Sequence, residues 1–103
     1  MKITMYGAAI CPDCVVAKQQ LSLKNDVEVE YKDITSATAI LKEFLKFRDS
    51  EPMFEPIKAD GKIGIPFFIL EDGTKTFDIE NYVAFDPNLV REVNACSIDG
   101  KNC

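Results

Sequence analysis

The sequence contains no histidine. This absence excludes a Ser-His-Asp triad, a Cys-His protease pair, and zinc or haem sites that need an imidazole ligand. Histidine is also the side chain that usually changes charge near neutral pH, so chemistry in that range must come from another group. Cysteine is the clearest candidate, because its thiolate is a nucleophile whose pKa follows its surroundings.

Positive charge and long apolar runs are scarce as well. Twelve Lys and Arg residues stand against 17 Asp and Glu residues, which gives a formal net charge of −5. This balance predicts no basic face for nucleic acid or for an anionic membrane. The longest apolar run, Ile65 to Leu70, is too short to span a bilayer, and Met1 to Met5 lack the pattern of a signal peptide. We therefore expect a cytoplasmic protein that binds neither nucleic acid nor membranes.

The chain has what a single packed domain requires. Its 103 residues are 47% hydrophobic, and the 4 cysteines are too few for a disulfide scaffold. We expect one domain over residues 1–95 and a polar tail over residues 96–103 that carries Cys96 and Cys103. We also expect a monomer.

Two periodicities alternate along the chain. Alternation of apolar and polar side chains, or an unbroken apolar run, predicts strands over residues 2–6, 27–31, 67–71 and 74–77. Spacings of three and four predict helices over residues 12–23 and 37–48 and from Pro87 onward. In the second of these helices, the apolar positions are Ala37, Ile40, Leu41, Phe44 and Leu45, and Ser36 is the expected cap. The connection over residues 49–64 shows neither pattern and is unusually long for a compact domain.

The order of these elements predicts the architecture. Strands that are joined through a helix are expected to run parallel, with a right-handed crossover. Asp72-Gly73 is a hairpin turn signal, so the last two strands are expected to be antiparallel. The predicted fold class is therefore α/β, in the order β-α-β-α-β-β-α, with a four-stranded mixed sheet flanked by three helices.

The motif that carries chemistry is Cys11-Pro12-Asp13-Cys14, at the junction between the first strand and the first helix. The first N–H groups of a helix lack intrahelical partners, and the helix dipole favours negative charge there, so a thiol at this place ionises readily. Cys14 lies one turn away, within reach of a disulfide with Cys11. We expect Cys11, at the exposed helix start, to attack a disulfide and the more buried Cys14 to resolve the intermediate.

A CxxC pair can also form half of a metal site. Zinc would need two further ligands, and the separation of Cys96 from Cys103 is not that of a zinc knuckle. A second hypothesis is therefore a metal or iron–sulfur binding module that uses Cys11 and Cys14, for example across a dimer. A third alternative is that the two cysteines are inert members of the core. The spacing favours a redox-active dithiol over both alternatives.

Pro66 stands at the start of the third predicted strand. With this proline and the CxxC, the chain resembles the glutaredoxins, which are small members of the thioredoxin superfamily. The resemblance covers residues 1–95 and rests on Tyr6 before a short loop, on the Cys-Pro-Asp-Cys motif, and on Gly64-Ile65-Pro66. It implies a thioredoxin-like fold and a thiol–disulfide oxidoreductase activity. It also implies that Pro66 is cis and faces the CxxC, and that Ile65 offers its backbone N–H and C=O to the substrate.

The resemblance also implies a set of site residues. The catalytic residues would be Cys11 and Cys14, and the substrate-binding residues would be Pro12, Asp13, Ile65, Pro66 and Asp78. The expected substrate is a disulfide-containing protein or a glutathione mixed disulfide. No bound cofactor is needed, and the electron donor is expected to be glutathione or a flavoprotein such as thioredoxin reductase.

The sequence departs from the glutaredoxin pattern around the motif. Ala8 stands where that family often has a lysine, and Asp13 stands where it often has an aromatic residue. Both changes are expected to raise the pKa of Cys11, since a nearby carboxylate disfavours a thiolate and a lost cation no longer favours it. In that family, a glycine pair and an acidic residue after the fourth strand bind glutathione. Residues 76–79 stand at that place in this sequence, and Asp78 is a remnant of the acidic residue. These departures favour a reductase over glutathione as the donor.

Apolar side chains in the connection over residues 49–64 leave two alternatives. Met53, Phe54 and Ile57 form either a small satellite core or a patch that binds a partner over the CxxC. Because apolar loop residues are usually buried, the satellite core is favoured.

The two tail cysteines leave three alternatives. They are separated by a segment with an Asp99-Gly100 turn signal, so their thiols could approach each other. Cys96 and Cys103 are then free thiols, a regulatory disulfide, or a relay that passes electrons to the CxxC. We expect that the tail is not needed for exchange at Cys11.

Overall fold

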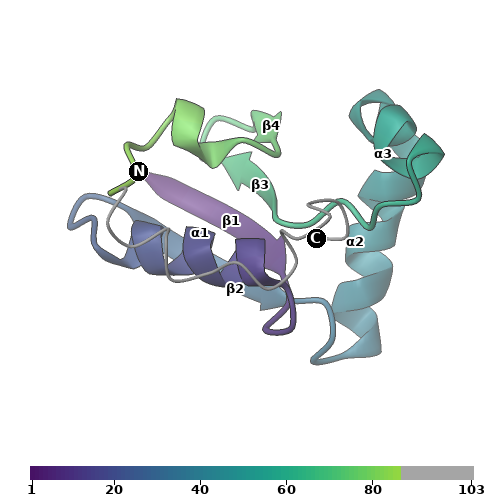
Figure 1. Ribbon diagram of the computed structural model, residues 1–103, viewed down its shortest axis with the longest axis horizontal. Coiled ribbons are helices and arrows are strands. Elements are labelled where there is room, and N and C mark those ends of the chain that lie inside the picture. The colour runs from purple at the N-terminus through teal and green to yellow at the C-terminus, as the bar shows by residue number, and fades with distance from the viewer. Residues whose placement is uncertain (87–103) are drawn as a thin grey trace.

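The computed structural model describes residues 1–86, which form four strands, three α-helices and two short 3₁₀ helices (Figure 1). In chain order these are β1 (Lys2–Gly7), α1 (Pro12–Ser22), β2 (Glu28–Asp33), α2 (Thr38–Ser50), η1 (Pro52–Phe54), α3 (Glu55–Ala59), β3 (Phe67–Leu70), β4 (Lys75–Thr76) and η2 (Ile79–Asn81). The fold class is α/β, as expected. The helix expected from Pro87, the domain boundary at residue 95, and Cys96 and Cys103 lie outside the described residues.

The four strands form one mixed sheet in the order β2-β1-β3-β4. As expected, β1 and β2 are parallel, and β3 and β4 are antiparallel. β3 runs antiparallel to β1, with Phe67 opposite Tyr6, so the expectation that helix-joined strands are parallel is wrong for β2 and β3. The reason is that η1 and α3 bring the chain back to the Gly7 end of β1 before β3 begins (Figure 1).

One face of the sheet packs against α1. Met5 of β1 and Phe68 of β3 lie opposite each other and are fully buried. The buried face of α1 has the expected spacing of three and four, with Cys14, Ala17 and Leu21 each at most 3% exposed. Figure 1 shows α1 alongside β1, so the CxxC at the start of α1 lies next to the carboxyl end of that strand.

The other face packs against α2 through aromatic rings. The rings of Phe44 and Phe47 lie 5.5 to 6.3 Å, centre to centre, from those of Tyr6 and Phe67. These are ordinary distances for tilted and edge-on aromatic contacts. This aromatic layer supports the point at which β3 begins, immediately after Ile65-Pro66.

The ends and the inner face expected for α2 from the sequence are partly wrong. Ser36 is not its cap, because the Ser36 hydroxyl donates to the backbone oxygen of Asp33 at 2.7 Å, and the capping residue is Ala37. Leu41 and Leu45 are each 36% exposed, whereas Phe44 is fully buried. The helix contacts the sheet mainly through the larger aromatic side chains, which reach farther and leave the leucines at the edge.

The connection over residues 49–64 is not an open loop. It contains η1 and α3, each with a proline in its first turn, where a missing N–H costs nothing. Phe54 is fully buried and packs against the rings of Phe44, Phe67 and Phe77. Met53 and Ile57 are partly buried against the same core. The burial that the satellite-core alternative predicts is confirmed, but these side chains join the main core and do not form a separate one.

Candidate functional site

Cys11 is the residue that caps α1. Its backbone is extended, Pro12 takes the first helical position as expected, and the backbone N–H of Cys14 donates to Cys11 Sγ at 3.3 Å. A side chain that accepts this N–H satisfies one of the unpaired donors of the first turn. Both the N–H dipole and the helix dipole stabilise negative charge at this place, so they favour the thiolate form of Cys11.

The two thiols have opposite acid–base behaviour. A hydrogen bond from the Cys14 side chain lowers the pKa of Cys11 to about 7, against burial, which raises it. The same interaction, together with burial, raises the pKa of Cys14 far above its usual range. Asp13 opposes ionisation of Cys11, as its sequence position predicts. Near neutral pH Cys11 is therefore the sulfur that ionises, while Cys14 stays a thiol.

The exposure expected for Cys11 is wrong. Its side chain is only 5% exposed, compared with 1% for Cys14, so both cysteines belong to the buried core. The loop before the helix closes over the cap, and the backbone N–H of Cys11 donates to the Ala8 oxygen at 3.1 Å. The difference in pKa, rather than a difference in burial, separates the two roles.

Gly7 lets the end of β1 approach the motif closely. A Cβ atom built on Gly7 would lie 3.0 Å from Cys14 Sγ and 3.3 Å from the ring of Tyr31. These contacts are tighter than those that real Cβ atoms usually make, so a larger residue would displace Cys14. The strand therefore packs closely against Cys14 because Gly7 has no side chain.

The Ile65-Pro66 peptide bond is cis, as the resemblance implies, and Pro66 opens onto the cavity beside the motif. Ile65 itself is buried, with 6% of the residue exposed. Arg48 fixes the approach to this point, because its guanidinium donates to the backbone oxygens of Lys62 and Ile63 at 2.8 and 2.9 Å. Nothing in the sequence pattern around Arg48 indicates this role.

A cavity of about 370 Å³ lies along α1 on the side of β3. It brings together three of the expected substrate-binding residues, Asp13, Pro66 and Asp78, from three separate parts of the chain. Pro12 and Ile65 do not line it. Sequence reasoning missed Glu80, which also lines the cavity, two positions after Asp78.

A buried glutamine holds the last described residues beside this cavity. Gln20 of α1 is fully buried, and its side-chain amide donates to the Asp86 oxygen at 2.6 Å and accepts from the Asp86 N–H at 2.7 Å. Phe85, the preceding residue, lines the cavity. Gln20 had no sequence signal beyond a polar residue at a position where the helical spacing predicts burial.

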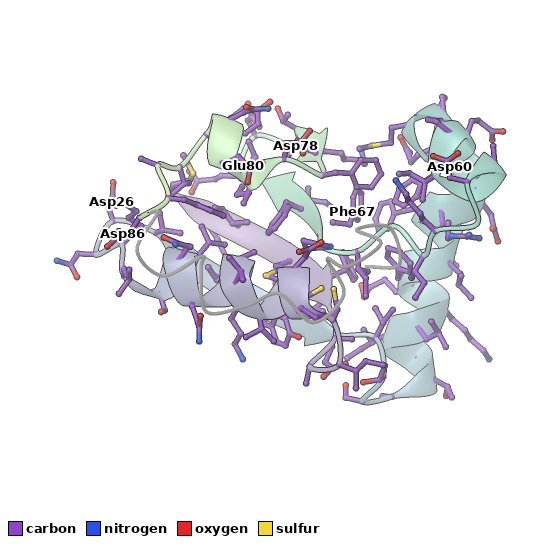
Figure 2. The ribbon with its side chains drawn as sticks, in the orientation of Figure 1. Asp26, Asp60, Phe67, Asp78, Glu80 and Asp86 are labelled. Atoms are coloured by element: carbon purple, nitrogen blue, oxygen red, sulfur yellow. The ribbon has the colours of Figure 1, made fainter. Side chains whose placement is uncertain are left out.

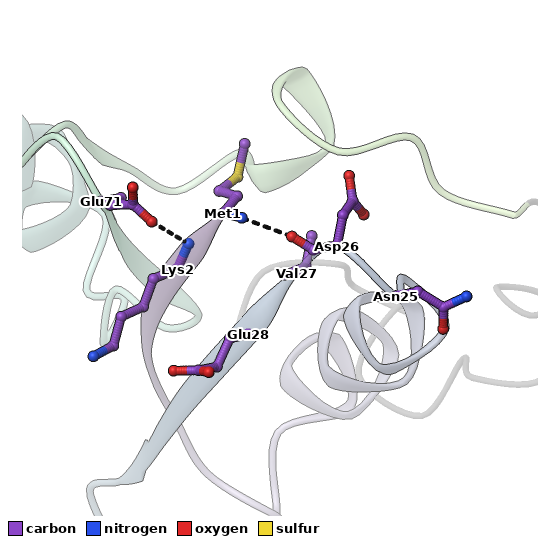
Figure 3. Close-up of a pocket in the computed structure, with 7 residues that line it drawn as sticks. All are labelled: Met1, Lys2, Asn25, Asp26, Val27, Glu28 and Glu71. Carbon is purple, nitrogen blue, oxygen red and sulfur yellow. Dashed lines mark hydrogen bonds between the residues drawn. The ribbon is translucent and has the colours of Figure 1, made fainter.

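A second cavity, of about 620 Å³, lies at the opposite end of β1 (Figure 3). Its lining includes Met1, whose amino group donates to the Asp26 oxygen at 2.6 Å, and Lys2, whose backbone N–H donates to Glu71 at 2.9 Å. No cysteine among residues 1–86 lines it, and β1 separates it from the CxxC by about 20 Å at the usual rise of a strand. It is therefore no part of the thiol site.

Within residues 1–86, no group of three or more cysteine, aspartate or glutamate side chains is arranged to hold a metal ion. No helix in the same range is long and apolar enough to cross a membrane. Any metal held by Cys11 and Cys14 would need further ligands from residues 87–103 or from a second chain.

Comparison with known proteins finds a relative in Haemophilus influenzae. That protein, described as uncharacterized, is 31% identical to this chain over 80 residues, which cover 76% of this chain and 90% of the relative. The two proteins belong to one family. No protein-family model and no solved structure matches the chain. Inferences about function therefore rest on the site itself.

Proposed function

We propose that this protein is a thiol–disulfide oxidoreductase of the glutaredoxin type, with a thioredoxin-like fold. The observation that carries the proposal is the hydrogen-bonded pair at the start of α1, in which the Cys14 N–H meets Cys11 Sγ at 3.3 Å. The Cys14 side chain, together with this N–H, lowers the pKa of Cys11 to about 7. An attacking thiol is most effective when its pKa lies near the ambient pH, because it is then both ionised and nucleophilic.

The exchange takes place in two displacements. The Cys11 thiolate attacks one sulfur of the substrate disulfide, whose S–S bond breaks, and the other sulfur leaves as a thiolate that takes up a proton. A mixed disulfide then joins Cys11 to the substrate. Cys14 loses its proton and attacks Cys11 Sγ, which releases the second substrate thiol and forms a Cys11–Cys14 disulfide. Two electrons pass from the protein dithiol to the substrate.

The protonation states suit this order of events. While Cys11 is a thiolate, the raised pKa of Cys14 keeps the second thiol protonated and out of the first attack. Once the mixed disulfide has formed, the Cys11 sulfur no longer carries the negative charge that disfavoured ionisation of Cys14. The pKa of Cys14 then falls, and the resolving attack can follow.

Return to the dithiol requires an external reductant. This is a low-molecular-weight thiol such as glutathione or a flavoprotein reductase such as thioredoxin reductase. The expected substrate contacts are the cavity residues Asp13, Pro66 and Asp78 and the backbone of Ile65. Support for this part is geometric, because the cavity lies along the helix that begins with the CxxC.

The test is a trapping experiment with single cysteine variants. Both would be made in a background in which Cys96→Ser and Cys103→Ser remove the tail thiols. Cys14→Ser is expected to retain the first attack and to accumulate a mixed disulfide, seen as the added mass of one substrate half. Cys11→Ser is expected to lose exchange. Equal trapping by both variants, or exchange by Cys11→Ser, would contradict the proposal. Running the turnover assay with each reductant identifies the electron donor.

A further inference from the structure

The cavity beside the CxxC has an apolar floor and an acidic rim. Apolar side chains from α1, β3 and the segment after β4 form the floor, among them Val16, Phe68 and Phe77. Among residues 1–86, the only charged residues in the lining are Asp13, Asp78 and Glu80, and all three are exposed. No lysine or arginine of the same range lines the cavity.

These three carboxylates are not neutralised by the described part of the chain. The ion pairs within residues 1–86 use other carboxylates: Lys32 with Glu43, Lys58 with Glu55 and Lys62 with Asp60. Figure 2 shows Asp78 and Glu80 near each other, far from Asp60 and from Asp26. A substrate that enters the cavity therefore meets a rim of one sign of charge above an apolar surface.

We propose that the cavity selects disulfides in protein segments whose cysteine is flanked by an apolar residue and a lysine or arginine, in preference to glutathione disulfide. This inference rests on the proposed function and adds the class of substrate. Glutathione carries more carboxylates than ammonium groups, so the rim repels it. A cationic side chain is attracted by the same rim, and complementary charge of this kind mainly raises the rate of productive encounter.

The apolar floor is what favours a protein segment over a small cation. An apolar neighbour of the reacting cysteine removes apolar surface from water when it enters the cavity, which favours binding. The reaction is the exchange described above. One half of the peptide disulfide leaves as a thiol, and the other remains on Cys11 until Cys14 displaces it. The external reductant named above, a low-molecular-weight thiol or a flavoprotein reductase, then restores the dithiol.

The test compares three symmetric peptide disulfides that differ at one position. Each half is an acetylated and amidated Cys-Leu-X tripeptide in which X is lysine, glutamine or glutamate. The expected order of kcat/KM is lysine, then glutamine, then glutamate, with about three- to tenfold between the first and the last at low salt. Because exposed charges are screened by ions, the range is expected to narrow at 0.5 M salt, where the Debye length is roughly 4 Å.

Matched double variants assign this preference to the rim. Asp78→Asn with Glu80→Gln is expected to reduce the lysine-to-glutamate ratio at least about twofold. Asp26→Asn with Glu28→Gln removes the same charge from two exposed residues with the same spacing near the other end of β1, and is expected to leave the ratio unchanged. Asp13 is kept in both variants, because its substitution would also alter the pKa of Cys11.

The outcomes separate the two proposals. If Cys11 reduces all three peptides at equal kcat/KM, or if both double variants change the ratio equally, the inference is wrong while the oxidoreductase stands. If cystamine, a small dication without an apolar group, is reduced as fast as the lysine peptide, assignment to a protein segment is wrong. If no disulfide is reduced in a Cys11-dependent manner, both the proposed function and this inference fail.

Discussion

Replacing Gly64 with alanine is expected to destabilise the protein by about 2–5 kcal/mol. Gly64 has a φ of 101°, which costs a residue with a Cβ about 1–2 kcal/mol. A Cβ there would also lie 2.7 Å and 3.0 Å from two ring carbons of Phe54. Phe54 is fully buried against Phe44 and Phe67, so it cannot move aside, and overpacking of this kind costs about 1–3 kcal/mol.

The chain offers its own controls for this prediction. Gly61 and Gly73 have φ values of 73° and 93°, but a Cβ at either position would meet nothing within 4 Å. Gly61→Ala and Gly73→Ala should therefore show only the backbone cost. Urea unfolding followed by far-UV circular dichroism is the assay, and Gly64→Ala should lower the midpoint by about 1–3 M at the usual dependence on urea.

An equal loss of stability in all three alanine variants would refute the packing argument. It would mean that Phe54 is not fixed against the segment that leads into Ile65-Pro66. The connection over residues 49–64 would then not support the substrate side of the site, and the burial of Phe54 would have no consequence for it.

Three further predictions concern the motif, the buried glutamine and the tail. Asp13→Asn is expected to lower the pKa of Cys11 further, because the carboxylate that disfavours the thiolate is removed. Thiolate absorbance measured against pH checks this, and an unchanged pKa would show that Asp13 does not act on the sulfur. Gln20→Leu should cost about 1–3 kcal/mol in urea unfolding, because it removes both hydrogen bonds that the Gln20 side chain makes with the Asp86 backbone. A loss no larger than that of the exposed control Gln19→Leu would contradict this. Deletion of residues 96–103 should leave the melting temperature and the Cys11-dependent rate intact, whereas a folded truncation without turnover would make the tail part of the relay.

The elements that follow from local pattern were predictable from the sequence. Pro12 after Cys11 gave the start of α1, and alternation around Tyr31 gave β2, within one or two residues of their observed bounds. The Asp72-Gly73 turn gave the antiparallel pair at the edge of the sheet. These features depend on neighbours in the chain, whose types the sequence states directly.

Features that depend on tertiary contacts were not predictable in the same way. Pro52 and Pro56 suggested a loop, but each opens a short helix that the packing of Phe54 holds in place. Leu41 and Phe44 are equivalent by helical spacing, and only the position of the sheet makes one exposed and the other buried. The direction of β3 likewise follows from where the chain re-enters the sheet.

In the candidate site, too, the features set by neighbouring residues could be predicted, and those that depend on tertiary contacts could not. The CxxC, its place on the helix and the opposing effect of Asp13 could be predicted, because they lie within four consecutive residues. The burial of Cys11 could not, since the preceding loop covers it. That Asp13 and Glu80 line the same cavity could not be predicted either, because 66 residues of the chain lie between them.

The pH dependence of alkylation of the reduced protein tests the central claim most directly. Iodoacetamide reacts with thiolates, and peptide mass spectrometry assigns the label to Cys11, Cys14 or the tail cysteines. The account predicts that Cys11 is labelled with a midpoint near pH 7, at a rate that falls about tenfold per pH unit well below it, while Cys14 stays unlabelled. Labelling of Cys14 before Cys11, or a midpoint for Cys11 near that of an ordinary thiol, would contradict the assignment of Cys11 as the nucleophile.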